Sequence, residues 1–376
     1  MVDIHAMLKL MADQGASDLF LTCGAPPHIK IEGVSHPIKL PAFKSGEVKE
    51  LAHSLMTERQ SAAFEDSLEA NLSLSLEGVG RFRINIYWQR GEVAMVVRLI
   101  KAKIPSFEQL GLPAQCAQLA MLKRGLVLFV GSAGSGKSTS MAAMIGYRAA
   151  MADGHILTIE DPIEFQFSHG LALVDQREVG IDTHSFGDAL RNALREAPDV
   201  IMIGEIRDEE TAHHAIAYAE TGHLCVSTLH ANNANQAIER IINFFPEQAH
   251  HQLFMDLSLN LKGVVSQRLV PAMDGKRALA TEVLLLSGYV AELIQKGRVD
   301  EIKEAMGRGN EFGMHTFDQS LFQLFKAGRI SLEEALRNAD SHTDLALRIR
   351  LSEYHTTAEA PSLTVAATGP GPYVPK

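Results

Sequence analysis

The sequence predicts an α/β protein with three parts: a smaller N-terminal α+β domain, a larger domain with a mostly parallel sheet between helices, and a helical C-terminal region. Two observations support this prediction. From residue 125, short apolar segments alternate with helix-like segments, which is typical of successive strand–helix–strand units. Before residue 102, alternating strand patterns are separated mainly by glycine-containing turns.

Composition indicates a folded chain without a secretion or membrane signal. The hydrophobic content is 46%, and the formal net charge is −10, which gives no overall electrostatic case for binding nucleic acid. The N-terminus lacks a basic segment followed by an apolar one, and no uninterrupted apolar run approaches the roughly 20 residues that span a bilayer. We therefore expect a cytoplasmic location.

The first 102 residues predict a small α+β domain. Apolar residues at helical spacing predict a helix over 3–14, and a longer helix-like region follows at 45–66. Alternating or β-rich patterns predict strands at 17–22, 29–31, 72–76, 81–88 and 93–100. Residues 103–115 have the composition of a linker, because prolines and glycine interrupt the pattern there.

Residues 116–286 predict the α/β core domain. Its expected strands are 126–130, 155–160, 171–175, 199–204 and 223–229, with a further strand pair at 264–271 and 278–285. Ligands of parallel sheets bind beyond the carboxyl ends of the strands. The loops that follow four of these strands are therefore expected to converge on one site: 131–138, 160–164, 204–208 and 229–232.

The C-terminal region, 287–355, reads as helical. Its expected helices are 289–296, 299–307, 316–327, 331–339 and 341–354. The last stretch, 356–376, is rich in Pro, Gly, Ala and Thr and poor in charge, which predicts a disordered tail. Docking of this tail on a partner is the alternative.

A phosphate-binding loop follows the first strand of the core. Residues 131–138 match G-x-x-x-x-G-K-[ST] and lie between an apolar strand and a helix, the context that this motif requires. Lys137 is expected to bridge the β- and γ-phosphates of ATP, and Ser138 to offer its hydroxyl to Mg²⁺. The predicted cofactor-binding residues are Gly131, Ser132, Ala133, Gly134, Ser135, Gly136, Lys137, Ser138 and Thr139.

Carboxylates follow two other core strands. Glu160, Asp161 and Glu164 lie within five residues at the end of one strand, where a cation or an attacking water makes such crowding useful. Glu205 follows the apolar strand 199–204 and presents a carboxylate at the Mg²⁺ end of the sheet. The alternatives are a solvated acidic turn for the first group and a helix N-terminal acid for Glu205.

One histidine and several arginines complete the candidate set. His230 ends the strand 223–229, where it can sense the γ-phosphate, although a histidine at a strand end is more often structural. Arg81 and Arg98 lie in the N-terminal domain, and phosphoryl transfer often recruits an arginine from a neighbouring element. Surface charges explain them equally well, and Arg195 and Arg207 are weaker candidates.

Six segments, which occur in one order along the chain, together resemble the secretion ATPase superfamily, in particular the PilT/PilU retraction ATPases of type IV pili. They are residues 131–139, 158–164, 175–179, 189–196, 204–208 and 221–230. The resemblance implies a homo-hexameric ring in which each subunit has an N-terminal PAS-like domain and a RecA-like P-loop ATPase core. It makes Glu164 the base that activates water and Glu205 a ligand of Mg²⁺, although these two roles could be exchanged. It also places His230 in the family's His box and matches Arg81 and Arg98 to arginines that reach the phosphates.

Two departures make the chain look more like the PilU branch, the accessory paralogue of the PilT type. Ala291 and Glu292 stand where the PilT type carries an Arg-Asn pair, and the chain continues past the usual end. The resemblance implies an ATPase that couples hydrolysis to pilus retraction and twitching motility. Its implied partners are a PilT-type retraction ATPase and an inner-membrane pilus platform protein, which would hold it peripherally at the membrane, with no nucleic acid. The alternatives are a nucleotide-binding regulatory partner with little turnover and, less favoured, a RecA-like nucleic-acid motor.

Overall fold

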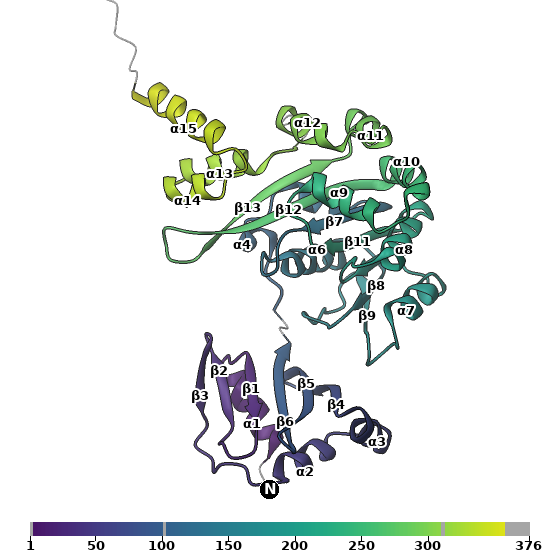
Figure 1. Ribbon diagram of the computed structural model, residues 1–376, viewed down its shortest axis with the longest axis vertical. Helices are drawn as coiled ribbons and strands as arrows, with labels where there is room; N and C mark the ends of the chain where they lie inside the picture. The colour runs from purple at the N-terminus through teal and green to yellow at the C-terminus, as the bar shows by residue number, and fades with distance from the viewer. Residues whose placement is uncertain (1–2, 101–102, 310–312, 358–376) are drawn as a thin grey trace, which may run out of the picture. The chain divides into compact units, whose positions relative to one another are not determined.

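The computed structural model describes residues 3–100, 103–309 and 313–357, and the chain begins with a six-stranded sheet (Figure 1). The strand order is β3-β2-β1-β6-β5-β4, and every pair for which a register is defined is antiparallel. The elements of this part are α1 (Ile4–Asp13), β1 (Asp18–Leu21), β2 (His28–Ile31), β3 (Val34–Pro37), α2 (Glu47–Ser54), α3 (Glu58–Ser67), β4 (Glu69–Leu76), β5 (Gly80–Gln89) and β6 (Glu92–Ile100).

Apolar periodicity explains the core of this first part. Helix α1 buries Ile4, Met7, Leu8 and Met11, and Asp3 caps it by accepting a hydrogen bond from the His5 backbone N–H. Strand β5 alternates in the same way, because Phe82, Ile84 and Ile86 are fully buried between half-buried polar neighbours. Strand β3 was not predicted: all four of its residues are exposed, so it lacks the apolar alternation that marks a strand.

The second sheet has seven strands in the order β13-β12-β7-β11-β10-β8-β9, and the pairs from β12 to β9 are parallel. All the strands predicted for the core are present, although β9 runs on to Glu178. They are β7 (Gly125–Val130), β8 (Gly154–Glu160), β9 (Ala172–Glu178), β10 (Val200–Ile203), β11 (Leu224–Leu229), β12 (Leu261–Pro271) and β13 (Arg277–Leu285). The helices among them are α6 (Lys137–Met151), α7 (Phe186–Ala193), α8 (Glu209–Glu220), α9 (Ala234–Asn243) and α10 (His250–Asn260).

Both faces of this sheet are covered, as the sequence predicted. In β7, Leu126, Leu128 and Val130 join a hydrophobic core with residues of α7, α8 and α9. Val127 and Phe129 are equally buried but alternate with them, so they point to the other face, and α6 packs on β7. Burial on both faces explains why the strand reads as a continuous apolar run.

The segment predicted as a linker contains one short helix and leads into another. They are α4 (Phe107–Leu110) and α5 (Gln115–Ala120). Ser106 and Gln109 form a capping box at α4, in which each side chain binds the other residue's backbone N–H. A single turn of helix between prolines is too short for apolar periodicity to reveal, which is why composition indicated only a linker.

Residues 270–280 and 317–357 belong to a second, smaller compact unit. Its helices are α13 (Phe317–Lys326), α14 (Leu332–Arg337) and α15 (His342–Thr357), and α11 (Gly288–Gln295) and α12 (Ile302–Arg308) precede them in the chain. Val270, Ala278 and Ala280 pack with Phe317 and Leu321 in its core. The tail predicted over 356–376 lies, from residue 358, outside the described residues. Among the residues that the structure describes, no helix combines the length and the apolar character that crossing a membrane requires.

Two leucines test the packing of the large sheet. Leu128 on β7 is fully buried, whereas Leu173 on β9 is 60% exposed. We expect Leu128→Ala to lower the free energy of unfolding by about 2–5 kcal/mol, because it leaves a cavity in a close-packed core. Leu173→Ala should stay within about 0.5 kcal/mol of the parent. Urea unfolding monitored by circular dichroism measures both, and equal losses would contradict the burial pattern.

Candidate active site

Residues from four loops line one cavity of about 260 Å³ at the carboxyl edge of the parallel sheet. These loops follow β7, β8, β10 and β11. The cavity brings together most of the side chains singled out from the sequence: Lys137 and Ser138, Glu160, Asp161 and Glu164, Glu205 and Arg207, and His230. Parallel strands end at the same edge, so residues far apart in sequence meet there.

At Gly131 and Gly136, the backbone of the 131–136 loop has a positive φ angle that favours glycine. Gly136 has φ +91° and caps the N-terminus of α6, and Gly131 has φ +155°. A Cβ atom on Gly131 would lie 2.4 Å from Ser135 Oγ and 2.7 Å from the Gln267 carbonyl oxygen. Ser138 and Thr139 follow in the first turn of α6, whose N-terminal N–H groups favour an anion.

Lys137 is a buried cation inside this loop. The residue is 7% exposed, and its ammonium group donates to the Gly131 and Ser132 carbonyl oxygens at 2.9 and 3.0 Å. Burial lowers the pKa of Lys137, while the carboxylates of Glu205 and Glu164 act in the opposite direction. The electrostatic potential at the ammonium group therefore depends on the carboxylates of both acidic loops.

His230 joins Lys137 to Glu205. Its Nδ1 lies 3.4 Å from Lys137 Nζ, and its Nε2 lies 3.4 Å from Glu205 Oε1. Because the ammonium group can only donate, Nδ1 accepts, and the ring hydrogen then belongs on Nε2, facing the carboxylate. The three side chains form a row from the phosphate-binding loop to the end of β10.

Glu160 and Glu164 have different environments although both follow β8. Glu160 is 5% exposed, and its Oε1 accepts hydrogen bonds from Thr158 Oγ1 at 2.7 Å and Gln176 Nε2 at 3.1 Å. Burial raises the pKa of Glu160 to about 7, against the lowering effect of these hydrogen bonds. Glu164 is exposed and lines the cavity, so it is free to meet a ligand or a water molecule.

The loop has the features that a phosphate group requires. Ser135 Oγ is buried, and the described residues offer it no hydrogen-bond partner. Lys137 donates only to carbonyl groups of the loop itself and to His230 among its described contacts. An anion at the loop would therefore gain a cation, a hydroxyl group and helix N-terminal N–H groups together.

A magnesium site made of protein ligands alone is absent from the described part of the chain. No group of three or more His, Cys, Asp and Glu side chains there is placed to hold a metal ion. A Mg²⁺ ion that accompanies phosphate groups usually takes one or two protein ligands and completes its shell with phosphate oxygens and water. Ser138 and Glu205, both at the cavity, are the residues available for that role.

Neither of the two arginines predicted from the N-terminal domain lines the cavity in this structure. Arg98 Nε donates to Asp18 at 2.9 Å, and Arg81 Nε donates to Ser73 Oγ at 2.8 Å. The arginine that lines the cavity is Arg207, which the sequence ranked lower. Its guanidinium group lies 3.5 Å from Asp161 Oδ2 and 4.7 Å from the centre of the Phe186 ring. The roles proposed for Arg81 and Arg98 remain predictions.

Sequence reasoning missed two glutamines that support the site. Gln267 on β12 is 1% exposed, and its Nε2 donates to Ser140 Oγ on α6 at 2.7 Å. Gln176 on β9 binds the segment that carries Glu164. For Gln267 the signal is a lone amide residue within an apolar strand pattern, since a buried polar side chain must find partners. Gln176 lies in a polar run one residue beyond the predicted strand and gave no such signal.

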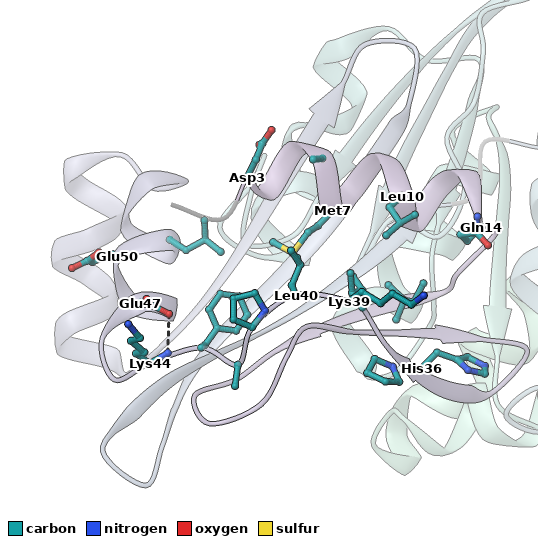
Figure 2. A pocket seen from close by; sticks show the side chains of 18 of the residues that line it. Asp3, Met7, Leu10, Gln14, His36, Lys39, Leu40, Lys44, Glu47 and Glu50 are labelled. Atoms are coloured by element: carbon teal, nitrogen blue, oxygen red, sulfur yellow. Dashed lines mark hydrogen bonds between the residues drawn. The ribbon is translucent and has the colours of Figure 1, made fainter.

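A larger cavity of about 1250 Å³ lies in the first sheet's part of the chain, between α1, the β2 and β3 strands, and α2 (Figure 2). Figure 2 shows Met7, Leu10 and Leu40 on its wall, with charged side chains such as Lys39 and Glu50 at the border. Its lining lacks the glycine-rich loop and the row of lysine, histidine and carboxylate that mark the smaller cavity. The nucleotide chemistry therefore belongs to the edge of the parallel sheet.

Comparison with known proteins agrees with this fold and site. A family model described as Type II/IV secretion system protein matches residues 2–353, so the chain belongs to this family. Its relatives are named ATPases, and the phosphate-binding loop with its acidic neighbours identifies the chain as a nucleotide-binding ATPase of that kind.

The particular relatives are pilus motors. The chain is 51% identical, over 96% of its length and 95% of the relative's, to the type IV pilus ATPase PilU of Pseudomonas aeruginosa. It is 40% identical, over 90% of its length and 98% of the relative's, to the type IV pilus retraction ATPase PilT of the same organism. A crystal structure of the pilus retraction motor PilT with bound ADP superimposes with a TM-score of 0.86 at 42% identity, covering 92% of this chain and 100% of that one. The resemblance and the fold class predicted from the sequence are confirmed.

Gly131→Ala tests the phosphate-binding loop. The added methyl group meets the Gln267 backbone and Ser135, so the loop must move. We expect binding of ADP, measured by calorimetry, to weaken by at least about tenfold. Gly288→Ala is the matched control, because a Cβ atom there meets nothing within 4 Å. Unchanged ADP affinity in Gly131→Ala would show that this loop does not hold the phosphates.

Proposed function

We propose that this chain hydrolyses Mg²⁺-bound ATP in a homo-hexameric ring and uses the energy to help retract type IV pili, as a PilU-like accessory motor. The observation that carries the proposal is near full-length similarity to PilU, at 51% identity, in a chain whose cavity gathers Lys137, Glu164, Glu205 and His230. A PilT-type retraction ATPase and an inner-membrane platform protein are its proposed partners, which place it at the cytoplasmic side of that membrane.

The proposed mechanism assigns a separate task to each side chain. Lys137 exchanges its contacts with the Gly131 and Ser132 carbonyl groups for the β- and γ-phosphates, which stabilises the charge that develops on transfer. Glu164, exposed at the cavity, takes the proton of the attacking water. Mg²⁺ neutralises phosphate charge when bound, with Ser138 and Glu205 as its protein ligands.

His230 is proposed to report the state of the γ-phosphate. It lies between Lys137 and Glu205, so a shift of the lysine toward phosphate oxygens would remove the contact at Nδ1 and leave His230 free to change its contact with the carboxylate. The side chain is 42% exposed, which leaves room for it to follow a ligand. No proton transfer by His230 is needed for this role.

The proposed motor moves one part of the chain against another when ATP binds and is hydrolysed. We propose that residues 1–102 act as the N-terminal domain, 103–115 as the linker, 116–286 as the ATPase core, 287–355 as the C-terminal region and 356–376 as a tail. Arg81 and Arg98 are proposed to reach the phosphates as the domains move. Arg81 would release Ser73 and its 3.8 Å ion pair with Glu178, and Arg98 would release Asp18. Arg207 is the competing candidate, because it already lines the cavity.

A regulatory partner with little turnover of its own is the second candidate. One observation favours it: Ala291 and Glu292 on α11 replace the Arg-Asn pair of the PilT type, and Glu292 forms a surface ion pair with Lys296 at 2.5 Å. A nucleic-acid motor is disfavoured by the formal net charge of −10.

Lys137→Ala should reduce ATP turnover by about 100- to 1,000-fold, because it removes the cation that stabilises the transferred phosphoryl group. Lys276→Ala changes an exposed lysine and serves as the control. Phosphate release measures turnover, and the melting temperature shows whether the fold persists. Parent-like turnover in a folded Lys137→Ala protein would refute the site.

Two isosteric substitutions separate the acidic roles. Glu164→Gln should abolish turnover while ATP still binds in a Mg²⁺-dependent way, since the base acts only in the chemical step. Glu205→Gln should lose the Mg²⁺-dependent part of the affinity. Titrating a fluorescent ATP analogue with and without Mg²⁺ measures both. The reverse pattern would exchange the roles, and full turnover in both variants would refute the assignment.

Turnover of the purified chain distinguishes the motor from the regulatory partner. We expect the chain alone to hydrolyse ATP, and a mixture with a PilT-type ATPase to exceed the sum of the separate rates. The same mixture with Lys137→Ala should lose this excess. If the chain alone is inactive and Lys137→Ala stimulates the partner as well as the parent does, the regulatory function is correct and the motor is not.

A further inference from the structure

Along the segment that carries Glu164, buried and exposed side chains alternate. Ile163, Phe165 and Phe167 are buried at 2%, 5% and 8% exposure, whereas Glu164 and Gln166 between them are exposed. The buried side chains anchor one side of the segment, which leaves Glu164 on the side of the cavity. Packing thus sets which way Glu164 faces, but apolar contacts alone do not fix the backbone along its length.

Gln176 supplies that second restraint from β9. Its Oε1 accepts the Phe167 backbone N–H at 2.8 Å, and its Nε2 donates to the Phe165 carbonyl oxygen at 2.9 Å. The amide side chain therefore pairs with this segment as a neighbouring strand would. Both contacts require the same orientation of the amide group. In the flipped orientation, the amide N–H would face the Phe167 N–H and the amide oxygen would face the Phe165 carbonyl oxygen.

The same amide group also reaches the other side of Glu164. Gln176 Nε2 donates to Glu160 Oε1 at 3.1 Å, and Glu160 is the last residue of β8, four positions before Glu164. Gln176 thus contacts a side chain before Glu164 and two backbone groups after it.

We propose that Gln176 is a positioning residue for ATP hydrolysis, which holds the 163–167 segment so that Glu164 meets the attacking water. It lies outside the cavity lining and does not touch the reacting atoms. The inference rests on the proposed function, because it takes Glu164 as the base. Misplacing a catalytic group by about 1 Å can cost about 100-fold in rate. Loss of the three hydrogen bonds of the Gln176 side chain should therefore lower the rate of turnover measurably.

Gln176→Met keeps the length of the side chain and removes its hydrogen bonds. We expect kcat to fall about 10- to 100-fold, with KM for Mg²⁺-bound ATP changed by less than about twofold. ADP affinity should match the parent, because the phosphate-binding loop is untouched. Asp175→Asn is the matched control: Asp175 is the adjacent polar residue on β9, exposed, and in contact with His155 instead.

Gln176→Glu should change the pH dependence of kcat in a way that a general loss of stability would not. Its Oε1 still accepts from Phe167, but the second oxygen faces the Glu160 carboxylate and the Phe165 carbonyl group. Protonation at low pH restores a donor at that position, so the ratio of its kcat to the parent's should rise from about pH 8 to about pH 6. The same ratio for Gln176→Met should be constant over this range.

The outcomes separate this proposal from the function on which it rests. Parent-like kcat in Gln176→Met, or loss of ADP binding together with turnover, overturns the positioning role. A pH-independent ratio for Gln176→Glu also overturns it. If Glu164→Gln retains full turnover while Gln176→Met is inactive, the assignment of Glu164 as the base fails instead, and Gln176 acts on the site by another route.

Discussion

The buried ammonium group of Lys137 is the interaction on which the rest of the site depends. Lys137 is 7% exposed, and an isolated charge at such a position is costly unless hydrogen bonds and opposite charges offset its lost hydration. The Gly131 and Ser132 carbonyl groups provide the hydrogen bonds, and the Glu164 and Glu205 carboxylates provide the charge. The loop, the two acidic segments and His230 are therefore best understood as parts of one arrangement around that cation.

The register of the parallel strands makes this arrangement possible. Val130 pairs with Leu229, so Gly131 and His230 follow at the same level of the sheet. Ile203 pairs with Ile159, which places Gly204 level with Glu160 one step beyond. Shifting any of these strands by one residue would turn its terminal side chains to the other face. The buried apolar residues of both faces hold the register, so packing throughout the sheet determines the geometry at its edge.

Much of the fold follows from the sequence because burial on both faces leaves a clear pattern. The core strands such as 126–130 and 199–204 read as apolar runs, and the glycines of 131–136 match a backbone that other residues would not adopt. Strand β3 was missed because its residues are all exposed and carry no alternation. Gln176 was missed for a different reason. Its importance lies in three contacts with residues 9 to 16 positions away, and no local pattern records which backbone groups a side chain will meet.

Helix α11 has one face that packing constrains and one face that is exposed to solvent. Glu292 and Lys296 form an ion pair on its surface, with side chains 53% and 55% exposed, so the pair is solvent-screened and contributes little to folding. Val290, Leu293 and Ile294 on the same helix are buried and fix its position. The fold therefore constrains one face of α11 and leaves the composition of the other free. Substitutions at Ala291 or Glu292 would therefore change the charge of this surface, whereas substitutions at Val290, Leu293 or Ile294 would disturb the packing that holds the helix.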